Sequence, residues 1–327
     1  GLFHPEAWPM SIKYLNIKEK YQTRRKVKNN QWYYQRDLLF DLANSGALWS
    51  MNKICKCYHE YYYEIKLTGC KIIPLPFERT KGEAEINIDT ITNTDSFSVL
   101  WIGRFDYFKN PSIMKIYKAL LKIYSETPKI NISFNIVGYG EGRRFKDDIQ
   151  LKLRNSPFRV NFLGEIPHEN LYKIIQENDI AICMGTSTIH TASLGLPTII
   201  VDAMDYCKMH LIKGVWFYES QFGYLGEGAY ADLINLQVPN RKGLYYLIKN
   251  YLKEKKELKY EIGLKCKKKA HLYCSDNIYR MILDFVQNSE YIKKKQIFRF
   301  NPIQRLVIRK GKDVKKAAKK YLNINAP

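Results

Sequence analysis

The sequence predicts an α/β protein in which two Rossmann-like parallel-sheet domains face a cleft, the first of them short or truncated. From Ser96 onward, short apolar runs alternate with amphipathic segments, as strands and helices do in a parallel sheet covered on both faces. The same alternation occurs once, more briefly, between residues 46 and 77. The 327 residues also exceed the roughly 100–200 that one domain needs, so a second core is expected.

The first domain is expected at residues 1–77, where the run GALWSMNKICKCYHEYYYEIKLTGCKIIPLP predicts a strand, a helix and a second strand. Residues 78–95 are polar and have no periodicity, which is typical of a linker. The second domain is expected at residues 96–274. Residues 275–327 are expected to form a C-terminal helix and a basic tail.

Within the second domain, six apolar runs predict successive strands: SFSVLWIG, ISFNIVG, VNFLG, IAICM, TIIVDA and VWFYE. The first helix is the clearest, because Asn110 can cap it and Pro111 suits its first turn. Its predicted buried stripe consists of Ile113, Ile116, Tyr117, Leu120, Leu121 and Tyr124. Further helices are predicted at residues 241–257, 259–272 and 275–293.

The composition limits the classes of partner. The 53 Lys and Arg residues exceed the 32 Asp and Glu residues and give a net charge of +21, which favours a phosphate-bearing ligand, a nucleic acid or an anionic membrane surface. The seven Cys residues are odd in number and lie mostly in apolar or helical surroundings, which predicts a reducing cytoplasm without a disulfide framework. No second Cys or His pair follows Cys55 and Cys57 at zinc-finger spacing, so no metal site is expected. With no membrane-length apolar run and no signal-peptide pattern, we expect neither a membrane span nor export by that route.

Two cations follow the first strand of the second domain. In WIGRFDYFKN, Arg104 and Lys109 lie five residues apart on the loop that leads into a helix. An Arg can bind two phosphate oxygens while a Lys adds a point charge, and this combination suits a diphosphate. The alternative is a pair of solvated loop cations.

Glycines follow the second strand, where Gly138 and Gly140 permit close approach of the backbone. With Gly142 they form G-x-G-x-G, which differs from the G-x-G-x-x-G of dinucleotide binders, and the alternative is a plain strand-to-helix turn. Farther along, residues 185–187 follow a strand and open a helix that contains His190. Free backbone N–H groups, hydroxyls and a positive helix end predict an anion site there, although Ser and Thr are also ordinary helix caps.

Together and in this order, the motifs of residues 97–202 resemble the nucleotide-sugar domain of GT-B glycosyltransferases of the family 4 type. The matching patterns are G-R-x-x-x-x-K at residues 103–109, V-G-x-G at 137–140, F-L-G-x-[VI] at 162–166 and a small-residue helix ending in G-x-P at 195–197. The resemblance implies transfer of a sugar from a nucleotide sugar to a glycan or lipid-linked acceptor in bacterial surface polysaccharide synthesis.

By position, the resemblance implies donor-binding roles for Arg104, Lys109, Gly138, Gly140, Glu165, Ile166, Gly185, Thr186, Ser187 and His190. Arg104 and Lys109 would neutralise the diphosphate, and the backbone around Glu165 and Ile166 would contact the nucleobase. His190 stands where the family has the second of two glutamates, the one that holds the ribose, and the GTS sequence replaces the segment with the first. Retention of configuration is also implied, with neither metal nor other cofactor, and no catalytic residue is assigned.

The resemblance extends weakly to residues 1–77, which would be the acceptor-side domain at about half the family's usual length. The chain is then either an N-terminally truncated piece or one with an abbreviated acceptor domain. Among His4, Glu6 and Trp8 near the start, His4 could serve as a base, but a structural role is favoured.

Residues 288–327 hold 12 Lys or Arg against two acidic residues, a net charge of +10. Within this tail an apolar stripe is formed by Val314, Ala317, Ala318, Tyr321 and Leu322. A basic amphipathic helix of this kind can lie on an anionic membrane, or it can pack on the first domain. The expected location is therefore cytoplasmic, with a peripheral position on the inner face of the membrane as one alternative.

Two other functions stay open. The short first domain and the absent glutamates favour a catalytically inactive nucleotide-binding homologue. A nucleic-acid binder could use the aromatics of QWYYQRD and HEYYYEIK beside RRKVK as stacking platforms. Because many of these aromatics recur at helical spacing, we expect them in the core and expect no nucleic acid as partner.

Overall fold

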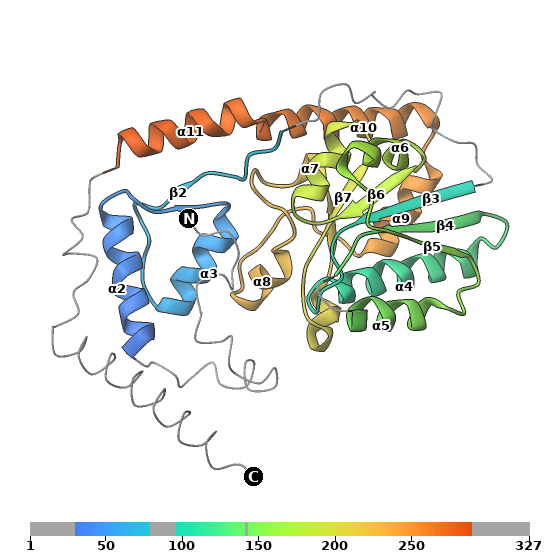
Figure 1. Cartoon of the computed structure of the whole chain (residues 1–327), viewed down its shortest axis with the longest axis horizontal. Helices are drawn as coiled ribbons and strands as arrows, with labels where there is room; N and C mark the ends of the chain where they lie inside the picture. Colours follow the sequence, from blue (N-terminus) through green and yellow to red (C-terminus); the bar gives the residue numbers. More distant parts are fainter. Residues whose placement is uncertain (1–29, 79–95, 141–142, 290–327) are drawn as a thin grey trace, which may run out of the picture.

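The computed structural model describes residues 30–78, 96–140 and 143–289, and Figure 1 shows them as two groups of elements side by side. The larger group is built on a six-stranded sheet with the order β5-β4-β3-β6-β7-β8. Its strands are β3 (Ser96–Ile102), β4 (Asn131–Val137), β5 (Arg159–Gly164), β6 (Ile180–Cys183), β7 (Thr198–Val201) and β8 (Gly214–Trp216). All neighbours pair in parallel except β7 and β8, which are antiparallel. The predicted parallel sheet is therefore confirmed.

Helices cover both faces of this sheet. In Figure 1, α4 and α5 lie on one face, while α6, α7 and α10 lie on the other. The helices of this group are α4 (Asn110–Glu126), α5 (Arg143–Leu153), α6 (Leu171–Gln176), α7 (Thr186–Ser193), α8 (Gly228–Leu233), α9 (Leu244–Lys253) and α10 (Lys256–Ala270). Short 3-10 segments are η3 (His168–Asn170), η4 (Tyr206–Leu211), η5 (Phe217–Glu219) and η6 (His271–Tyr273).

Strand β3 shows why two covering layers are needed. Phe97, Val99 and Trp101 belong to the core that includes α4, whereas Leu100 and Ile102 belong to the core that includes α6. Side chains alternate across a strand, so an almost uninterrupted apolar run must be buried on both sides.

Helix α4 begins one residue earlier than a cap at Asn110 requires. Asn110 is its first helical residue, and its side-chain oxygen accepts a hydrogen bond from the Asp106 N–H at 3.1 Å. Pro111 lies in the first turn as predicted. The prediction that Leu121 is buried with the rest of the stripe is wrong, because this side chain is 38% exposed.

The smaller group contains the predicted strand, helix and strand. Its elements are α2 (Asn30–Asn44), β1 (Trp49–Ser50), α3 (Lys53–Tyr63) and β2 (Lys71–Ile72), and β1 pairs with β2 in parallel. Asn52 caps α3 by accepting the Cys55 N–H at 2.8 Å. Trp32 and Tyr63 are buried with their ring centroids 5.8 Å apart, so aromatics considered for base stacking lie partly in this core.

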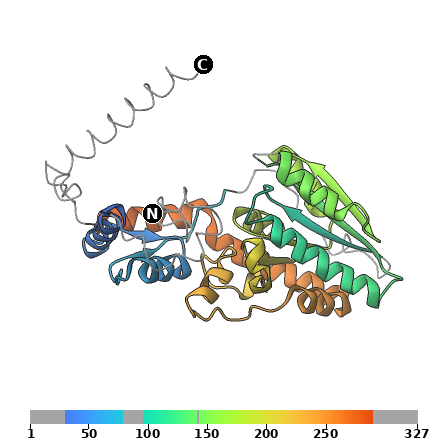
Figure 2. The same ribbon diagram turned by 90° about the horizontal axis from the view of Figure 1, so that it is seen from below.

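Helix α11 (Ser275–Gln287) runs from the larger group back along the smaller one, as Figure 1 and Figure 2 both show. At its start, the Phe77 N–H donates to the Tyr273 carbonyl at 2.8 Å. Beyond its end, the Ser289 hydroxyl donates to the Gly46 carbonyl at 2.9 Å. The three predicted C-terminal helices are present as α9, α10 and α11. In the described ranges, none of the helices combines the length and the apolar character that a membrane crossing requires.

Candidate functional site

The predicted donor-binding residues gather at the carboxyl edge of the six-stranded sheet. Hydrogen bonds join the chain just past the strand ends: the Gly103 N–H donates to the Val137 carbonyl at 3.0 Å, and the Gly138 N–H donates to the Gly164 carbonyl at 2.8 Å. At the end of β6, Gly185 begins the connection to α7. Ligands of open parallel sheets bind at this edge, because the loops that diverge from neighbouring strands leave a crevice there.

Arg104 and Lys109 are brought close together. Arg104 is exposed, and Lys109 is the residue from which α4 starts. Burial lowers the pKa of Lys109, and the nearby Arg104 charge lowers it further, while Asp106 acts in the opposite direction. Two mutually repelling cations at the end of one strand are stabilised when an anion binds between them, and the prediction that both contact one diphosphate stays a prediction.

Lys109 also reaches toward β6. Burial raises the pKa of the Cys183 thiol to about 12, and the charge of Lys109 lowers it. The Lys109 ammonium lies 5.8 Å from the centre of the Phe108 ring. Cys183 is the last residue of β6 and Gly185 follows two residues later, so the ammonium lies near the end of β6, from which the chain leads into α7.

Gly138 and Gly140 are required by close packing between loops. Gly138 has φ +155°, and a Cβ there would come within 1.9 Å of the Gly103 carbonyl oxygen. A Cβ at Gly140 would come within 2.7 Å of the Phe105 carbonyl oxygen. Side chains at these positions would push away the loop that carries Arg104, so both glycines position a predicted ligand-binding residue.

Gly164 and Gly185 differ from this pair, because their backbone faces open space. They have φ +73° and +68°, and an added Cβ at either would meet no atom within 4 Å. Gly164 directly precedes Glu165, which is exposed, and Ile166, which is half-buried. The backbone on which the nucleobase prediction rests is therefore accessible next to a glycine turn.

The predicted anion site is the amino end of α7 (Thr186–Ser193). Gly185 precedes Thr186, the first helical residue, and no side chain caps the helix. Thr186 is exposed and Ser187 is half-buried. The hydroxyl oxygen of Thr188, which is fully buried, has no hydrogen-bond partner among the described residues. An uncapped amino end with nearby hydroxyls is a suitable place for phosphate oxygens.

His190 lies deeper than the prediction of ribose contact assumed. It is 4% exposed, and its ring stacks on that of His168 with centroids 4.6 Å apart and an 11° angle between the planes. Phe77, at the end of the segment after β2, contacts His190 with ring centroids 5.7 Å apart. Since His168 is exposed, it is the member of the pair that a ligand can reach. Sequence reasoning missed His168 because stacking between residues 22 positions apart leaves no local pattern.

A buried cluster of ion pairs lies just past the end of β7. Asp202 follows β7 and is fully buried, and Arg241 donates to its Oδ2 from Nε at 3.1 Å and from Nη2 at 2.5 Å. Arg241 also pairs with Asp232 at 2.7 Å, and the Tyr224 hydroxyl donates to Asp202. Each charge is thus paired inside the protein, which indicates a structural role.

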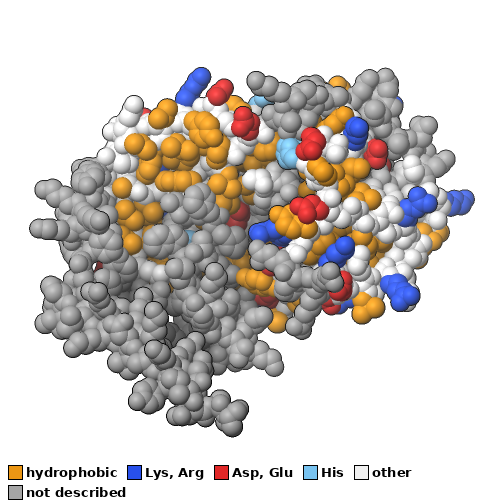
Figure 3. All heavy atoms as spheres, in the orientation of Figure 1, with side chains coloured by type: hydrophobic (Ala, Val, Ile, Leu, Met, Phe, Trp, Pro, Cys, Tyr) orange, Lys and Arg blue, Asp and Glu red, His pale blue; other side chains and the backbone are white. Residues whose placement is uncertain are grey.

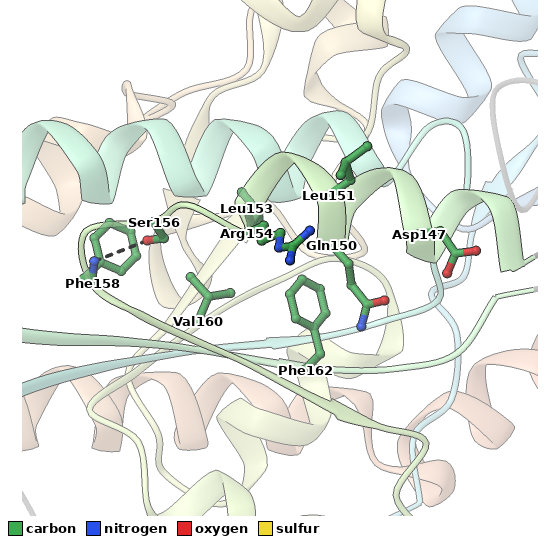
Figure 4. A pocket seen from close by; sticks show the side chains of 9 residues that line it. All are labelled: Asp147, Gln150, Leu151, Leu153, Arg154, Ser156, Phe158, Val160 and Phe162. Atoms are coloured by element: carbon green, nitrogen blue, oxygen red, sulfur yellow. Dashed lines mark hydrogen bonds between the residues drawn. The ribbon is translucent and has the colours of Figure 1, made fainter.

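The hollow in Figure 4 is a different place. It has a volume of about 570 Å³ and lies between α5 and the edge strand β5. Its lining consists of Asp147, Gln150, Leu151, Leu153, Arg154, Ser156, Phe158, Val160 and Phe162. None of these is a predicted donor-binding residue, and Val160 and Phe162 project from β5 toward α5 in the figure. A single Arg beside apolar side chains does not match the pair of cations expected for a diphosphate.

Metal coordination has no candidate within the described ranges, where no three His, Cys, Asp or Glu side chains group in a way that could hold an ion. His4, Glu6, Trp8 and the basic tail lie outside the described residues.

No protein-family model matches the sequence, and no curated protein matches it. Among solved structures, Anabaena HepE in complex with UDP and glucose superposes with a TM-score of 0.52 at 13% identity, covering 80% of this chain and 67% of HepE. The chain has a GT-B-like fold. S. aureus TarM gives 0.47 at 13% identity, over 79% of this chain and 46% of TarM. The pneumococcal O-GlcNAc transferase GtfA gives 0.42 at 15% identity, over 80% of this chain and 48% of GtfA. This GT-B-like chain thus spans less than half the length of TarM or GtfA.

Proposed function

We propose that the protein transfers a sugar from a nucleotide-sugar donor to an acceptor, with the donor diphosphate held between Arg104, Lys109 and the amino end of α7. The observation that carries this proposal is the proximity of the two cations at one edge, on the side where α7 begins. HepE, the neighbour of similar fold, has UDP and glucose bound in its structure, which supports the same class of ligand here.

The proposed mechanism is stabilisation of the leaving group. When the glycosidic bond breaks, negative charge grows on the diphosphate and the sugar becomes oxocarbenium-like. Arg104, Lys109 and the backbone N–H groups at the start of α7 would offset that charge without a metal ion, and removal of one such donor typically lowers turnover by about 10²–10³-fold. The family 4 type, retention of configuration and a role in bacterial surface polysaccharide synthesis belong to the proposal as implications of the sequence motifs.

Nucleotide binding is the first test. UDP, GDP, ADP and CMP are each added at millimolar concentration, and the melting temperature is measured. A ligand at about a hundred times its dissociation constant stabilises a protein by about 2.7 kcal/mol, which corresponds to roughly 4 °C for a chain of this size. Arg104→Ala should abolish the shift, whereas the exposed Arg280→Ala on α11 should leave it unchanged. Equal shifts in both variants would contradict the proposed site.

Catalysis needs a second measurement. Incubation with nucleotide sugars should release a nucleoside diphosphate, and Lys109→Ala should reduce the release while the fold is retained. The competing function is that of a catalytically inactive homologue. It is favoured because position 190, where the resemblance implies a ribose-binding glutamate, holds a buried His that stacks on His168. Nucleotide binding without any release or transfer, over a broad donor panel and with lipid-linked acceptors present, would support the inactive homologue.

We also propose that the protein works at an anionic membrane surface on the cytoplasmic side. Helix α11 leads directly into the tail of net charge +10, and its exposed stripe contains Tyr279 at 52%, Leu283 at 60% and Val286 at 62% exposure. Apolar atoms gather at the upper left of Figure 3, where α11 runs in Figure 1. An apolar stripe next to a basic segment suits a surface of acidic lipids, with about 1 kcal/mol from each nearby cation.

Co-sedimentation with vesicles tests the membrane proposal. The full chain should bind phosphatidylglycerol vesicles and not phosphatidylcholine vesicles, and the double variant Leu283→Gln, Val286→Gln should bind less. Leu264→Gln, at an exposed leucine of α10, is the matched control. Equal binding of both variants, or a wild-type dimer that the double variant converts to monomer, would refute the membrane role of α11.

A further inference from the structure

A short turn holds the amino end of α7 in place. We call residues 223–227, between η5 and α8, the Gly226 turn. The Gly185 N–H donates to the Leu225 carbonyl at 2.8 Å, and the Ala203 N–H donates to the Gly226 carbonyl at 2.8 Å. The turn therefore bonds to the chain just past both β6 and β7, and the position of Gly185 depends on it.

The carboxyl group of Glu227 fastens this turn from inside. Glu227 is 5% exposed, and its Oε2 accepts the Leu225 N–H at 3.0 Å. Leu225 thus has its N–H bonded to Glu227 and its carbonyl bonded to Gly185. Burial raises the pKa of Glu227 to about 7, the Asp202 charge raises it too, and hydrogen bonds from the backbone act against both. This carboxyl group therefore titrates near neutral pH.

The smaller group of elements contacts the other side of the turn. The Asn52 side-chain amide, at the start of α3, donates to the Gly223 carbonyl at 3.2 Å. The Gly223 N–H donates to the Tyr273 hydroxyl at 2.8 Å. The Gly226 turn is consequently enclosed between α3, η6 and the sheet edge, so water cannot readily solvate a charge on Glu227.

Four titratable groups act electrostatically with Glu227: Cys55 on α3, Tyr273 in η6, Tyr224 in the turn and Asp202 after β7. Burial raises the pKa of the thiol and of both phenols, so these three are neutral at pH 7. Asp202 is paired with Arg241. Within the described residues Glu227 has no cationic partner of its own, so its ionised form is disfavoured by burial and by Asp202.

We propose that Glu227 is a positioning residue whose protonation state determines how firmly Leu225 holds Gly185, and hence how well the amino end of α7 binds a phosphate-bearing ligand. The ligand part of this inference rests on the proposed function, whereas the hold on Gly185 does not. The neutral carboxyl keeps the turn closed. Ionisation places an unpaired charge in an enclosed site and favours opening of the turn toward water.

Binding and protonation are then linked in both directions. A diphosphate at the start of α7 brings negative charge toward Glu227 and further favours its neutral form. Binding therefore takes up a proton at Glu227, and loss of that proton weakens binding by the same factor. If only the protonated form is competent and half of it is lost at pH 7, the competent fraction falls roughly tenfold between pH 6 and pH 8.

Amide hydrogen exchange tests the hold on Gly185 without any ligand. In the wild type, protection of the Gly185 amide should fall about tenfold between pH 6 and pH 8 after correction for the intrinsic rate. In Glu227→Gln, whose amide oxygen can still accept the Leu225 N–H, protection should not change. The Gly103 amide, bonded to Val137 at the same edge, is the internal control. Unchanged protection in the wild type, or the same loss in the variant, would overturn the proposal.

Titration calorimetry with UDP tests the link to binding. Between pH 6 and pH 8 the wild type should lose about tenfold more affinity than Glu227→Gln, and Glu257→Gln, at an exposed glutamate of α10, should follow the wild type. The titration of UDP itself is common to all three proteins and cancels in the comparison. A parallel pH dependence in wild type and Glu227→Gln would overturn the link to binding. If the wild type bound none of UDP, GDP, ADP and CMP at either pH, that result would instead count against the proposed function, and hydrogen exchange would still decide the role of Glu227.

Discussion

Because of the buried His59, the free energy of unfolding should decrease by a calculable amount as the pH falls below neutral. The ring is buried in α3, its Nδ1 bonds to the Cys55 carbonyl at 2.6 Å, and its Nε2 has no partner in the described part of the chain. Burial lowers the pKa of His59 from 6.5 to about 4, against the weaker effect of the hydrogen bond. The unfolded chain therefore takes up a proton at a higher pH than the folded chain.

The sign and size follow from this difference. Stability is fully present above the unfolded pKa of 6.5 and is lost as the pH falls toward 4. Between pH 7.5 and pH 5 the loss from this one group is about 2 kcal/mol, out of a maximum of about 3 kcal/mol below pH 4.

Urea denaturation at both pH values measures the loss. His59→Gln removes the titrating group, so its stability should fall about 2 kcal/mol less than that of the wild type over this interval. His271→Gln, at an exposed histidine, should behave like the wild type. Identical pH dependence in wild type and His59→Gln would refute the reasoning, whatever their absolute stabilities.

Three further predictions concern the sheet edge. In Glu227→Gln, the free energy of unfolding should rise relative to that of the wild type as the pH increases. The folded pKa of about 7 lies above the usual 4.5, so the wild type loses about 2.5 kcal/mol of stability between pH 5 and pH 8. The variant should keep this stability, as measured by urea denaturation. Gly138→Ala should destabilise by about 1–3 kcal/mol, since its Cβ would meet the Gly103 carbonyl oxygen at 1.9 Å. The drop in melting temperature should exceed that of Gly164→Ala, which has open space. Arg241→Leu should cost about 3–5 kcal/mol by leaving the buried Asp202 charge unpaired, and acidic buffer should partly restore it.

Much of the fold could be predicted from local pattern. The strands from SFSVLWIG to TIIVDA, the helix after Asn110 and the parallel pairing of β1 with β2 all follow from apolar periodicity and from the length of the connecting segments. The prediction was wrong where the burial of a residue depends on the elements packed next to it. Leu121 belongs to an apolar stripe in the sequence, but α4 turns this residue toward solvent.

In the candidate site too, some features could be predicted from local sequence and others depend on tertiary packing. The placement of Arg104, Lys109 and residues 185–187 at one edge could be predicted, because strand-to-helix connections of a parallel sheet must meet there. The burial of His190 under His168 could not, because it depends on two segments that only the folded chain brings together. The same holds for Glu227, whose carboxyl is unusual only because Leu225, Asp202 and the α3 side enclose it.

The sequence by itself determined the parallel sheet, the cluster of cations after its first strand and the excess of positive charge, since these depend on residue type and spacing along the chain. Only the tertiary structure decided which glycines serve packing and which face open space, which histidine a ligand can reach and which carboxyl holds its proton near pH 7. These properties arise from desolvation and close contact between distant segments, and neither is encoded in any short stretch of residues.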